Sequence, residues 1–296
     1  MRVRYSFSSR KTGRTDSSNK HRKEFPDITR AVLDSSDIIL EVLDARFIEE
    51  TRNPELEKTA IEKGKKIIFV LNKSDLTDEK EIKKTAPYPF VMVSCKSRRG
   101  SSDLREKIKI EAKKIKNDIH LAWKQAKNIP HSEECGFQGI QNEKISVGVI
   151  GYPNTGKSSI INLLTGKPAA GTAAESGFTK GIQKIKLSEN LYLIDTPGVI
   201  PDKENSSINR NDLVKHGMIN VRTYDKIREP EFVVHELMKR NPEAFEKFYN
   251  IKSGGNSEVF IDILGKRKGF LSKGGVVNID RTARLILKDW QEGKIR

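Results

Sequence analysis

The chain has 296 residues and a formal net charge of +15, from 55 Lys and Arg against 40 Asp and Glu. Its length can hold one larger domain and a smaller second one, and its excess of positive charge predicts a polyanionic partner. The sequence contains no run of about 18 apolar residues that could span a membrane, and its N-terminal stretch lacks the apolar core of a signal peptide.

Positive charge is concentrated in three segments. Residues 1–23 carry eight Lys or Arg against one acid, residues 98–127 carry ten against four, and residues 266–296 carry nine against three. The first segment has little apolar material to bury, so it is either an arm that orders on RNA or a plain disordered tail. Concentrated charge favours binding to a phosphate backbone over the alternative of an evenly basic, solvated surface.

A predicted buried strand at 67–71 leads into Asn72-Lys73-Ser74-Asp75, the N-K-x-D pattern of GTP-binding proteins. The Asp75 carboxylate can accept hydrogen bonds from both N1–H and the exocyclic amine of guanine, a donor pair that adenine lacks. Taken alone, the same four residues could form a turn and a helix cap, with Asp75 solvated. A further strand at 89–93 precedes Ser94-Cys95-Lys96, which resembles the S-A-K loop that supports the base with main-chain N–H groups.

A phosphate-binding pattern, Gly151-Tyr-Pro-Asn-Thr-Gly-Lys-Ser158, stands between an apolar strand at 145–150 and a helix from Lys157 onward. Its glycines let the backbone curl so that several N–H groups point at phosphate oxygens. Lys157 is expected to reach the β- and γ-phosphates, and the Ser158 hydroxyl to bind Mg²⁺. The strand–loop–helix context favours a phosphate loop over a glycine turn that binds nothing.

Two later motifs complete the predicted site. Asp195-Thr-Pro-Gly198 follows a strand at 191–194; Asp195 would hold Mg²⁺ through a water, and the Gly198 N–H would contact the γ-phosphate. Upstream of Asp195, Thr179 resembles the switch threonine that completes Mg²⁺ coordination when GTP is bound. The alternative for Thr179 is a place in a flexible surface loop.

The alternation of apolar strands with helices predicts a doubly wound α/β sheet with ligand loops at the strand ends. The six strands are expected near 38–43, 67–71, 89–93, 145–150, 182–187 and 191–194. After Pro201 the pattern becomes helical, with helices expected at 231–240, 242–249, 257–264 and 278–292. We therefore divide the chain into a basic arm (1–23), an α/β domain (24–205) and a smaller helical domain (206–296) that we expect to bind RNA.

The order of the motifs is informative, because the base-recognition motif precedes the phosphate loop. This order resembles the circularly permuted GTPases of the YlqF/YawG type, which act in assembly of the large ribosomal subunit. The segments Asp44-Ala45-Arg46, Arg52-Asn53-Pro54, 269–275 and 280–293 extend the resemblance over nearly the whole chain. The chain departs from the family at Ile48 and Ser176, where proline is common; both changes affect turn stiffness more than ligand chemistry.

The resemblance implies a GTP/GDP site with Mg²⁺, and rRNA with the large ribosomal subunit as partners. The implied nucleotide contacts are Asn72, Lys73, Asp75, Ser94, Cys95, Lys96, Asn154, Thr155, Gly156, Lys157, Ser158, Ser159, Thr179, Asp195 and Gly198. The implied magnesium ligands are Ser158, Thr179 and Asp195. We expect Lys157, Thr179 and Gly198 to act in GTP hydrolysis.

The source of further catalytic help is open. Val199 stands where many GTPases place a water-orienting glutamine, and valine cannot hydrogen-bond to water, so hydrolysis is expected to be slow without an activating partner. Asn154 resembles the asparagine of potassium-activated GTPases, which helps bind a monovalent cation; its alternative role is that of a turn residue. His21 lies 23 residues before Asp44, a spacing like that of a catalytic histidine in some relatives; its alternatives are RNA contact or simple solvation.

Two classes of function stay open. The first is a GTPase switch that docks on large-subunit rRNA during ribosome assembly. The second is a GTP-regulated RNA-binding or signalling module with a non-ribosomal partner. A metabolic kinase is disfavoured, because Asp75 selects guanine and no second-substrate motif is evident. The two cysteines and His131 are too few for a disulfide framework or a structural zinc site, so we expect a cytoplasmic protein with reduced thiols. We also expect a monomer without a membrane partner.

Overall fold

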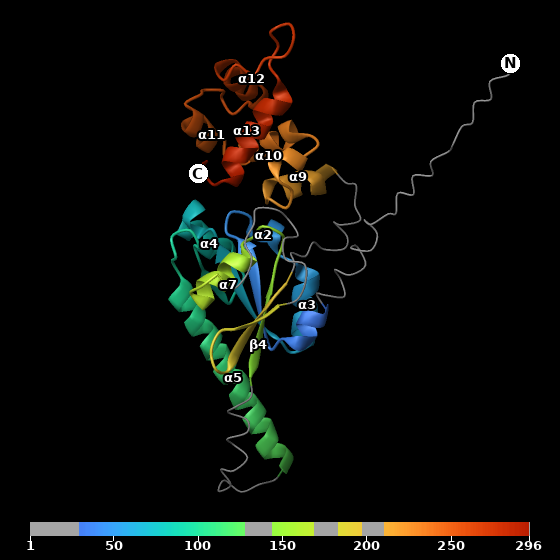
Figure 1. Cartoon of the computed structure of the whole chain (residues 1–296), viewed down its shortest axis with the longest axis vertical. Helices are drawn as coiled ribbons and strands as arrows, with labels where there is room; N and C mark the ends of the chain where they lie inside the picture. The colour runs from blue at the N-terminus through green and yellow to red at the C-terminus, as the bar shows by residue number, and fades with distance from the viewer. Residues whose placement is uncertain (1–29, 128–143, 169–182, 197–209, 296) are drawn as a thin grey trace, which may run out of the picture.

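The computed structural model describes residues 30–127, 144–168, 183–196 and 210–295. Figure 1 shows two parts. The first is a twisted sheet flanked by helices, which we call the sheet part (30–127, 144–168 and 183–196). The second lies beyond one end of the strands, and we call it the helical part (210–295). No helix within these ranges is both long enough and apolar enough to cross a membrane.

All six predicted strands are confirmed, and they form one mixed α/β sheet in the order β3-β2-β1-β4-β6-β5. Neighbouring strands are parallel except for the β5–β6 pair, which is antiparallel. The strands are β1 (Ile38–Asp44), β2 (Lys66–Asn72), β3 (Phe90–Met92), β4 (Ile145–Ile150), β5 (Gln183–Lys186) and β6 (Leu191–Asp195). The base motif follows β2 and the phosphate loop follows β4, so the permuted order lies within a single sheet.

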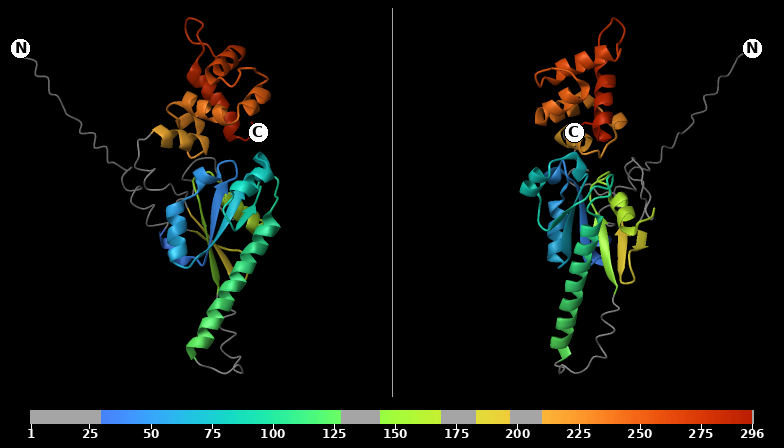
Figure 2. Two further views of the ribbon diagram at one scale, coloured as in Figure 1. Left: turned by 180° about the vertical axis from the view of Figure 1, so that it is seen from behind. Right: turned by 90° about the vertical axis from the view of Figure 1, so that its left-hand side faces the viewer.

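Helices cover both faces of the sheet (Figure 2), which explains why the central strands are mainly apolar on both faces. One face packs on α5 (Ser101–Lys127) and α7 (Lys157–Thr165). The other packs on the helical residues 30–35, α3 (Pro54–Glu62) and α4 (Glu79–Thr85). The predicted basic segment 98–127 therefore falls mainly on the long helix α5.

The helical part has its own apolar core, and the four helices predicted for it are confirmed. Asn241, Asn256 and Asn278 cap three of the helices through side-chain oxygens that accept backbone N–H groups. The elements are α9 (Arg210–Met218), η3 (Tyr224–Lys226), α10 (Pro230–Arg240), α11 (Pro242–Tyr249), α12 (Ser257–Arg267) and α13 (Ile279–Gln291). The proposed boundaries near residues 23 and 205 lie outside the described residues and stay predictions.

The two parts meet through a small aromatic contact. Phe47 of the sheet part packs edge-on against Trp290, with ring centroids 5.9 Å apart. Tyr152 of the phosphate loop is also buried in the core of the helical part. Arg46 lies over the Trp290 ring at 4.9 Å. Ile48, one of the positions that departs from the family, begins the short helix α2 (Ile48–Thr51) and is buried; Ser176 lies outside the described residues.

Candidate nucleotide-binding site

The predicted ligand loops that the structure describes gather at one edge of the sheet. They follow the carboxyl ends of β2, β3, β4 and β6, which are parallel strands and therefore end on the same side. This edge is where open α/β sheets bind ligands.

The phosphate loop has the backbone conformation that its glycines permit. Gly151 has a φ of 146° and Gly156 a φ of 98°, and α7 begins immediately afterwards at Lys157. A Cβ atom at Gly156 would collide with the side-chain nitrogen of Asn72, so this position needs both the positive φ and the missing side chain. Asn154 also has a positive φ, 61°, and serves as a turn residue here.

Lys157 and Asp195 form the buried, charged centre of the site. The Lys157 ammonium donates a hydrogen bond to the Tyr152 carbonyl at 2.8 Å. Burial lowers the pKa of Lys157 to about 8, although the negative charge of Asp195 opposes this shift. Burial raises the pKa of Asp195, whereas Lys157 and the nearby Ser158 hydroxyl favour its charged form.

Asp195 and Ser158 fit a magnesium ion. Asp195 has no exposed surface, and neither of its carboxylate oxygens has a hydrogen-bond partner at normal geometry among the described residues. Buried carboxylate oxygens are rarely left without a partner. Oxygen atoms from a carboxylate and a hydroxyl are the ligands that Mg²⁺ prefers, so Asp195 and Ser158 provide a suitable donor set.

Asn72 connects the loop of the base-recognition motif (72–75), which we call the base loop, with two other loops. Its side-chain nitrogen donates to the Thr155 carbonyl of the phosphate loop at 2.8 Å. Its side-chain oxygen accepts from the Cys95 N–H at 3.4 Å. In the same region the Ser94 hydroxyl donates to Asp75 at 2.6 Å, which orients the carboxylate predicted to bind guanine. The sequence motifs at 72–75 and 94–96 are therefore brought together in space.

The Asp44-Ala45-Arg46 motif holds Lys73. The Lys73 ammonium and the Arg46 guanidinium both donate to the Asp44 carboxylate, with closest distances of 2.8 Å. Burial alone would raise the pKa of Asp44, but the two adjacent cations hold it far below its usual range. Lys73 has a left-handed backbone with a φ of 60°, and this ion pair fixes its side chain beside the base loop.

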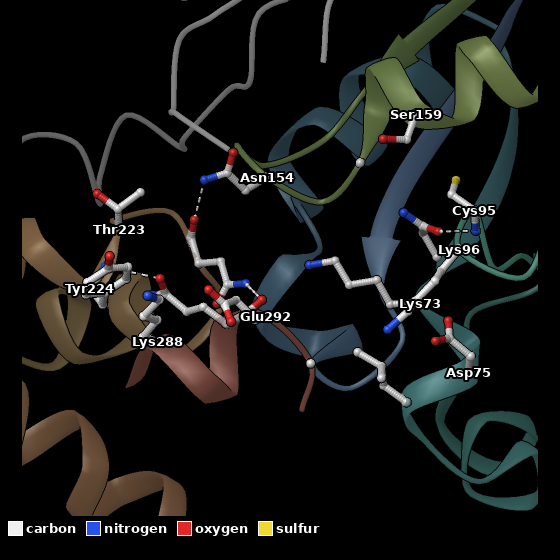
Figure 3. A pocket seen from close by; sticks show the side chains of 16 residues that line it. Lys73, Asp75, Cys95, Lys96, Asn154, Ser159, Thr223, Tyr224, Lys288 and Glu292 are labelled. Carbon is white, nitrogen blue, oxygen red and sulfur yellow. Dashed lines mark hydrogen bonds between the residues drawn. The ribbon is translucent and has the colours of Figure 1, made fainter. Parts of the chain in front are cut away.

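A pocket of about 450 Å³ lies between the two parts of the molecule. Figure 3 shows Lys73 and Asp75 on one side of it, and Tyr224, Lys288 and Glu292 on the other. Besides the predicted residues Asn72, Lys73, Asp75, Cys95, Lys96, Asn154, Gly156 and Ser159, it is lined by Leu76, Asn220, Thr223, Tyr224, Lys288, Gln291, Glu292 and Gly293. Sequence reasoning missed the helical-part residues of this second group, because no motif marks them and they lie far along the chain from the base loop.

Four predicted functional positions lie outside the described residues: His21, Thr179, Gly198 and Val199. Their assigned roles stay predictions. The lining of the pocket does not include five of the predicted site residues that the structure describes: Ser94, Thr155, Lys157, Ser158 and Asp195.

Comparison with known proteins agrees with this geometry. The family described as 50S ribosome-binding GTPase matches residues 146–251. An uncharacterised GTP-binding protein of Methanocaldococcus jannaschii is 35% identical over 90% of this chain and 65% of its own length. The nucleolar GTP-binding protein 2 of Neurospora crassa is 34% identical over 89% of this chain and 40% of its own length.

The chain contains a domain that matches this GTPase family, and its motif order and fold are those of the circularly permuted GTPases. The fold of the chain is that of YlqF from T. maritima, whose GDP-bound and GNP-bound structures match with a TM-score of 0.54. They are 21% and 22% identical to it, and each is covered over 94% of its length. A nuclear GTP-binding protein of Saccharomyces cerevisiae is 30% identical over 93% of this chain. The chain spans between 40% and 65% of the length of these curated relatives.

Proposed function

We propose that this GTPase binds GTP and GDP with magnesium, hydrolyses GTP, and acts as a switch on the large ribosomal subunit during its assembly. The observation that carries the nucleotide part is the side chain of Asn72, which ties the base loop directly to the phosphate loop. A guanine held at Asp75 would therefore place its phosphates at the loop that ends in Lys157.

Each residue has a role that its chemistry supports. Asp75 would accept the two donors of guanine, and the backbone N–H groups of the phosphate loop would bind phosphate oxygens. Lys157 would donate to the β- and γ-phosphates, and phosphate would restore the full positive charge that burial weakens. Ser158 and Asp195, with Thr179, would hold the magnesium ion, which supplies charge neutralisation for the leaving phosphate.

Asn154 and His21 are the candidates for further catalytic help. In the structure the Asn154 side-chain nitrogen donates to the Asn220 carbonyl at 2.6 Å. Its side-chain oxygen is the atom that a potassium ion would use, so the potassium role is retained as a proposal. The roles of Gly198 at the γ-phosphate and of His21 in catalysis are retained in the same way, together with a slow basal rate.

The ribosomal part rests on relatives and charge. The matching family carries ribosome binding in its description, and two relatives are named as nucleolar or nuclear GTP-binding proteins. The net charge of +15 suits an rRNA partner. A GTP-regulated RNA-binding module with a non-ribosomal partner is the alternative. We retain a monomer and a cytoplasmic location as predictions; the two relatives are named as nucleolar and nuclear proteins.

Nucleotide specificity provides the first test. We expect GDP and GTP, but not ADP or ATP, to displace a fluorescent GDP analogue, and Asp75→Ala to weaken GDP binding by about 100-fold or more. Unchanged GDP affinity in Asp75→Ala would refute the assigned base site.

Hydrolysis should then be measured in potassium and in sodium buffer, each with and without purified large ribosomal subunits. Strong stimulation by subunits would support the assembly switch, and no stimulation would favour the non-ribosomal alternative. A higher rate in potassium than in sodium would support the cation role of Asn154.

A further inference from the structure

Asn220 occupies the junction between the two parts of the molecule. Its backbone carbonyl accepts the hydrogen bond from the Asn154 side chain of the phosphate loop at 2.6 Å. Its own side-chain nitrogen donates to the Gln291 carbonyl of α13 at 3.4 Å. The backbone of Asn220 is left-handed, with a φ of 63°, a conformation that asparagine tolerates better than most residues.

The side-chain oxygen of Asn220 has no hydrogen-bond partner among the described residues. The residue is 9% exposed and it lines the pocket. Buried polar atoms are almost always paired, and an exception calls for an explanation such as a missing ligand. Because Asn220 lines the pocket, a molecule bound in the pocket is a candidate source of the missing donor.

The position of Asn220 identifies that donor. Asp75 marks the base end of the pocket, and Asn154 and Gly156 of the phosphate loop mark its phosphate end, so the sugar of a bound nucleotide would lie between them. Guanine would donate hydrogen bonds from its N1–H and amine to Asp75, and the phosphates have no hydrogen-bond donors at neutral pH. The remaining donors of the nucleotide are the 2′- and 3′-hydroxyls of the ribose.

We propose that Asn220 accepts a hydrogen bond from a ribose hydroxyl, so that the helical part contributes directly to the nucleotide site. The inference rests on the proposed guanine-nucleotide site described above. The bound nucleotide would then bridge the two parts, with its base and phosphates on the sheet part and its sugar on the helical part.

The surrounding contacts hold Asn220 in place for this role. Gln291 uses its side-chain amide to join the elements around the pocket: it donates to the carbonyls of Gly217 and Arg222 at 3.3 and 3.0 Å, and accepts from the Tyr224 N–H at 3.1 Å. Because these groups are already satisfied, Gln291 is a positioning residue. The Lys288 ammonium lies 6.0 Å from the centre of the Tyr224 ring and adds positive charge to the same wall.

The test compares GDP with 2′,3′-dideoxy-GDP on the full chain and on three variants. Asn220→Gly removes the acceptor while allowing the left-handed backbone. Asn220→Asp keeps an acceptor oxygen, and both variants lose the donor to the Gln291 carbonyl, so the comparison between them isolates the acceptor. Asn250→Gly is the matched control, because Asn250 is also left-handed, with a φ of 51°, and belongs to the helical part but does not line the pocket.

We expect the wild-type chain and Asn250→Gly to bind GDP about three- to tenfold more tightly than the dideoxy analogue, as one neutral hydrogen bond predicts. Asn220→Asp should keep this preference, and Asn220→Gly should bind both ligands equally. A preference in Asn220→Gly as large as that of the wild type, or no preference in the wild type, would overturn the proposal.

Parallel measurements separate this inference from the proposed function. Circular dichroism should show the same melting temperature for Asn220→Gly and Asn250→Gly, so that a lost preference cannot reflect unfolding. If Asp75→Ala weakens GDP binding but Asn220→Gly leaves the sugar preference intact, only the ribose contact is wrong. If Asp75→Ala has no effect, the proposed nucleotide site itself is wrong.

Discussion

Replacing Glu41 by Gln is expected to remove a large pH dependence of folding stability. Glu41 lies in the middle of the buried strand β1 and is 1% exposed. One carboxylate oxygen accepts the Asn53 N–H at 2.9 Å, and the other has no partner among the described residues. Burial, with the negative charge of Glu57, raises the pKa of Glu41 from 4.5 to about 8, against the opposing effects of Asn53 and Arg52.

The size and sign of the effect follow from this pKa. The folded protein holds the Glu41 proton more tightly than the unfolded chain, so the stabilisation is fully present below pH 4.5. It is lost progressively as the pH rises towards 8, and above 8 it stays constant. At about 1.4 kcal/mol per pKa unit, the gap between 4.5 and 8 corresponds to at most about 5 kcal/mol. Glutamine carries no titrating proton and keeps the acceptor for Asn53.

Urea unfolding of the wild type and of Glu41→Gln between pH 5 and 8.5, followed by far-UV circular dichroism, measures this difference. We expect the unfolding free energy of the wild type to fall relative to the variant by about 3–4 kcal/mol over that range. Glu62→Gln is the control, since the Glu62 side chain is 63% exposed and should follow the wild-type curve. Parallel curves for the wild type and Glu41→Gln would show that Glu41 is ionised in the folded protein at all these pH values.

Three further changes test the site. Asn72→Ala removes both of its inter-loop hydrogen bonds and should raise the dissociation constant for GDP at least about tenfold; an unchanged value in fluorescence titration would argue against coupling of the two loops. Gly156→Ala should abolish GDP binding without unfolding the chain, since a Cβ there would collide with Asn72, and retained binding would mean that the loop adapts. Arg46→Lys replaces a two-point contact with Asp44 by a single ammonium and should lower the free energy of unfolding in urea by about 1–2 kcal/mol. An unchanged free energy of unfolding would mean that Lys73 alone stabilises the Asp44 carboxylate.

The sheet and the main ligand loops were predictable because each is encoded locally. The strands at 38–44 and 145–150 are mainly apolar segments, and a motif begins at or just after the end of each. Asp75 and Lys157 could be assigned because each belongs to a short motif whose residues are adjacent in the chain. The ion pair between Asp44 and Lys73 joins residues 29 positions apart, and the sequence contained a motif at Asp44 but no sign of its partner.

The helical side of the pocket could not be predicted for a physical reason. The places of Asn220 and Lys288 depend on how the helical part docks on the sheet part, and that docking is set by side-chain packing such as that between Phe47 and Trp290. Helical periodicity shows which face of α13 is buried, but not which loop of a distant element lies against its end. Gly293, whose Cβ would press against Leu76 of the base loop, is typical of a helix end and carries no separate signal.

The contact between Asn154 and Asn220 changes how the potassium hypothesis should be tested. The side-chain nitrogen of Asn154 holds the helical part, whereas a cation would be bound by the side-chain oxygen. Substitution of Asn154 by Ala removes both groups at once, so a slower variant would not show which of them matters. A difference between potassium and sodium in the wild type reports on cation binding, and a change in sugar preference reports on the junction. Only the two measurements together separate catalysis at the γ-phosphate from attachment of the helical part.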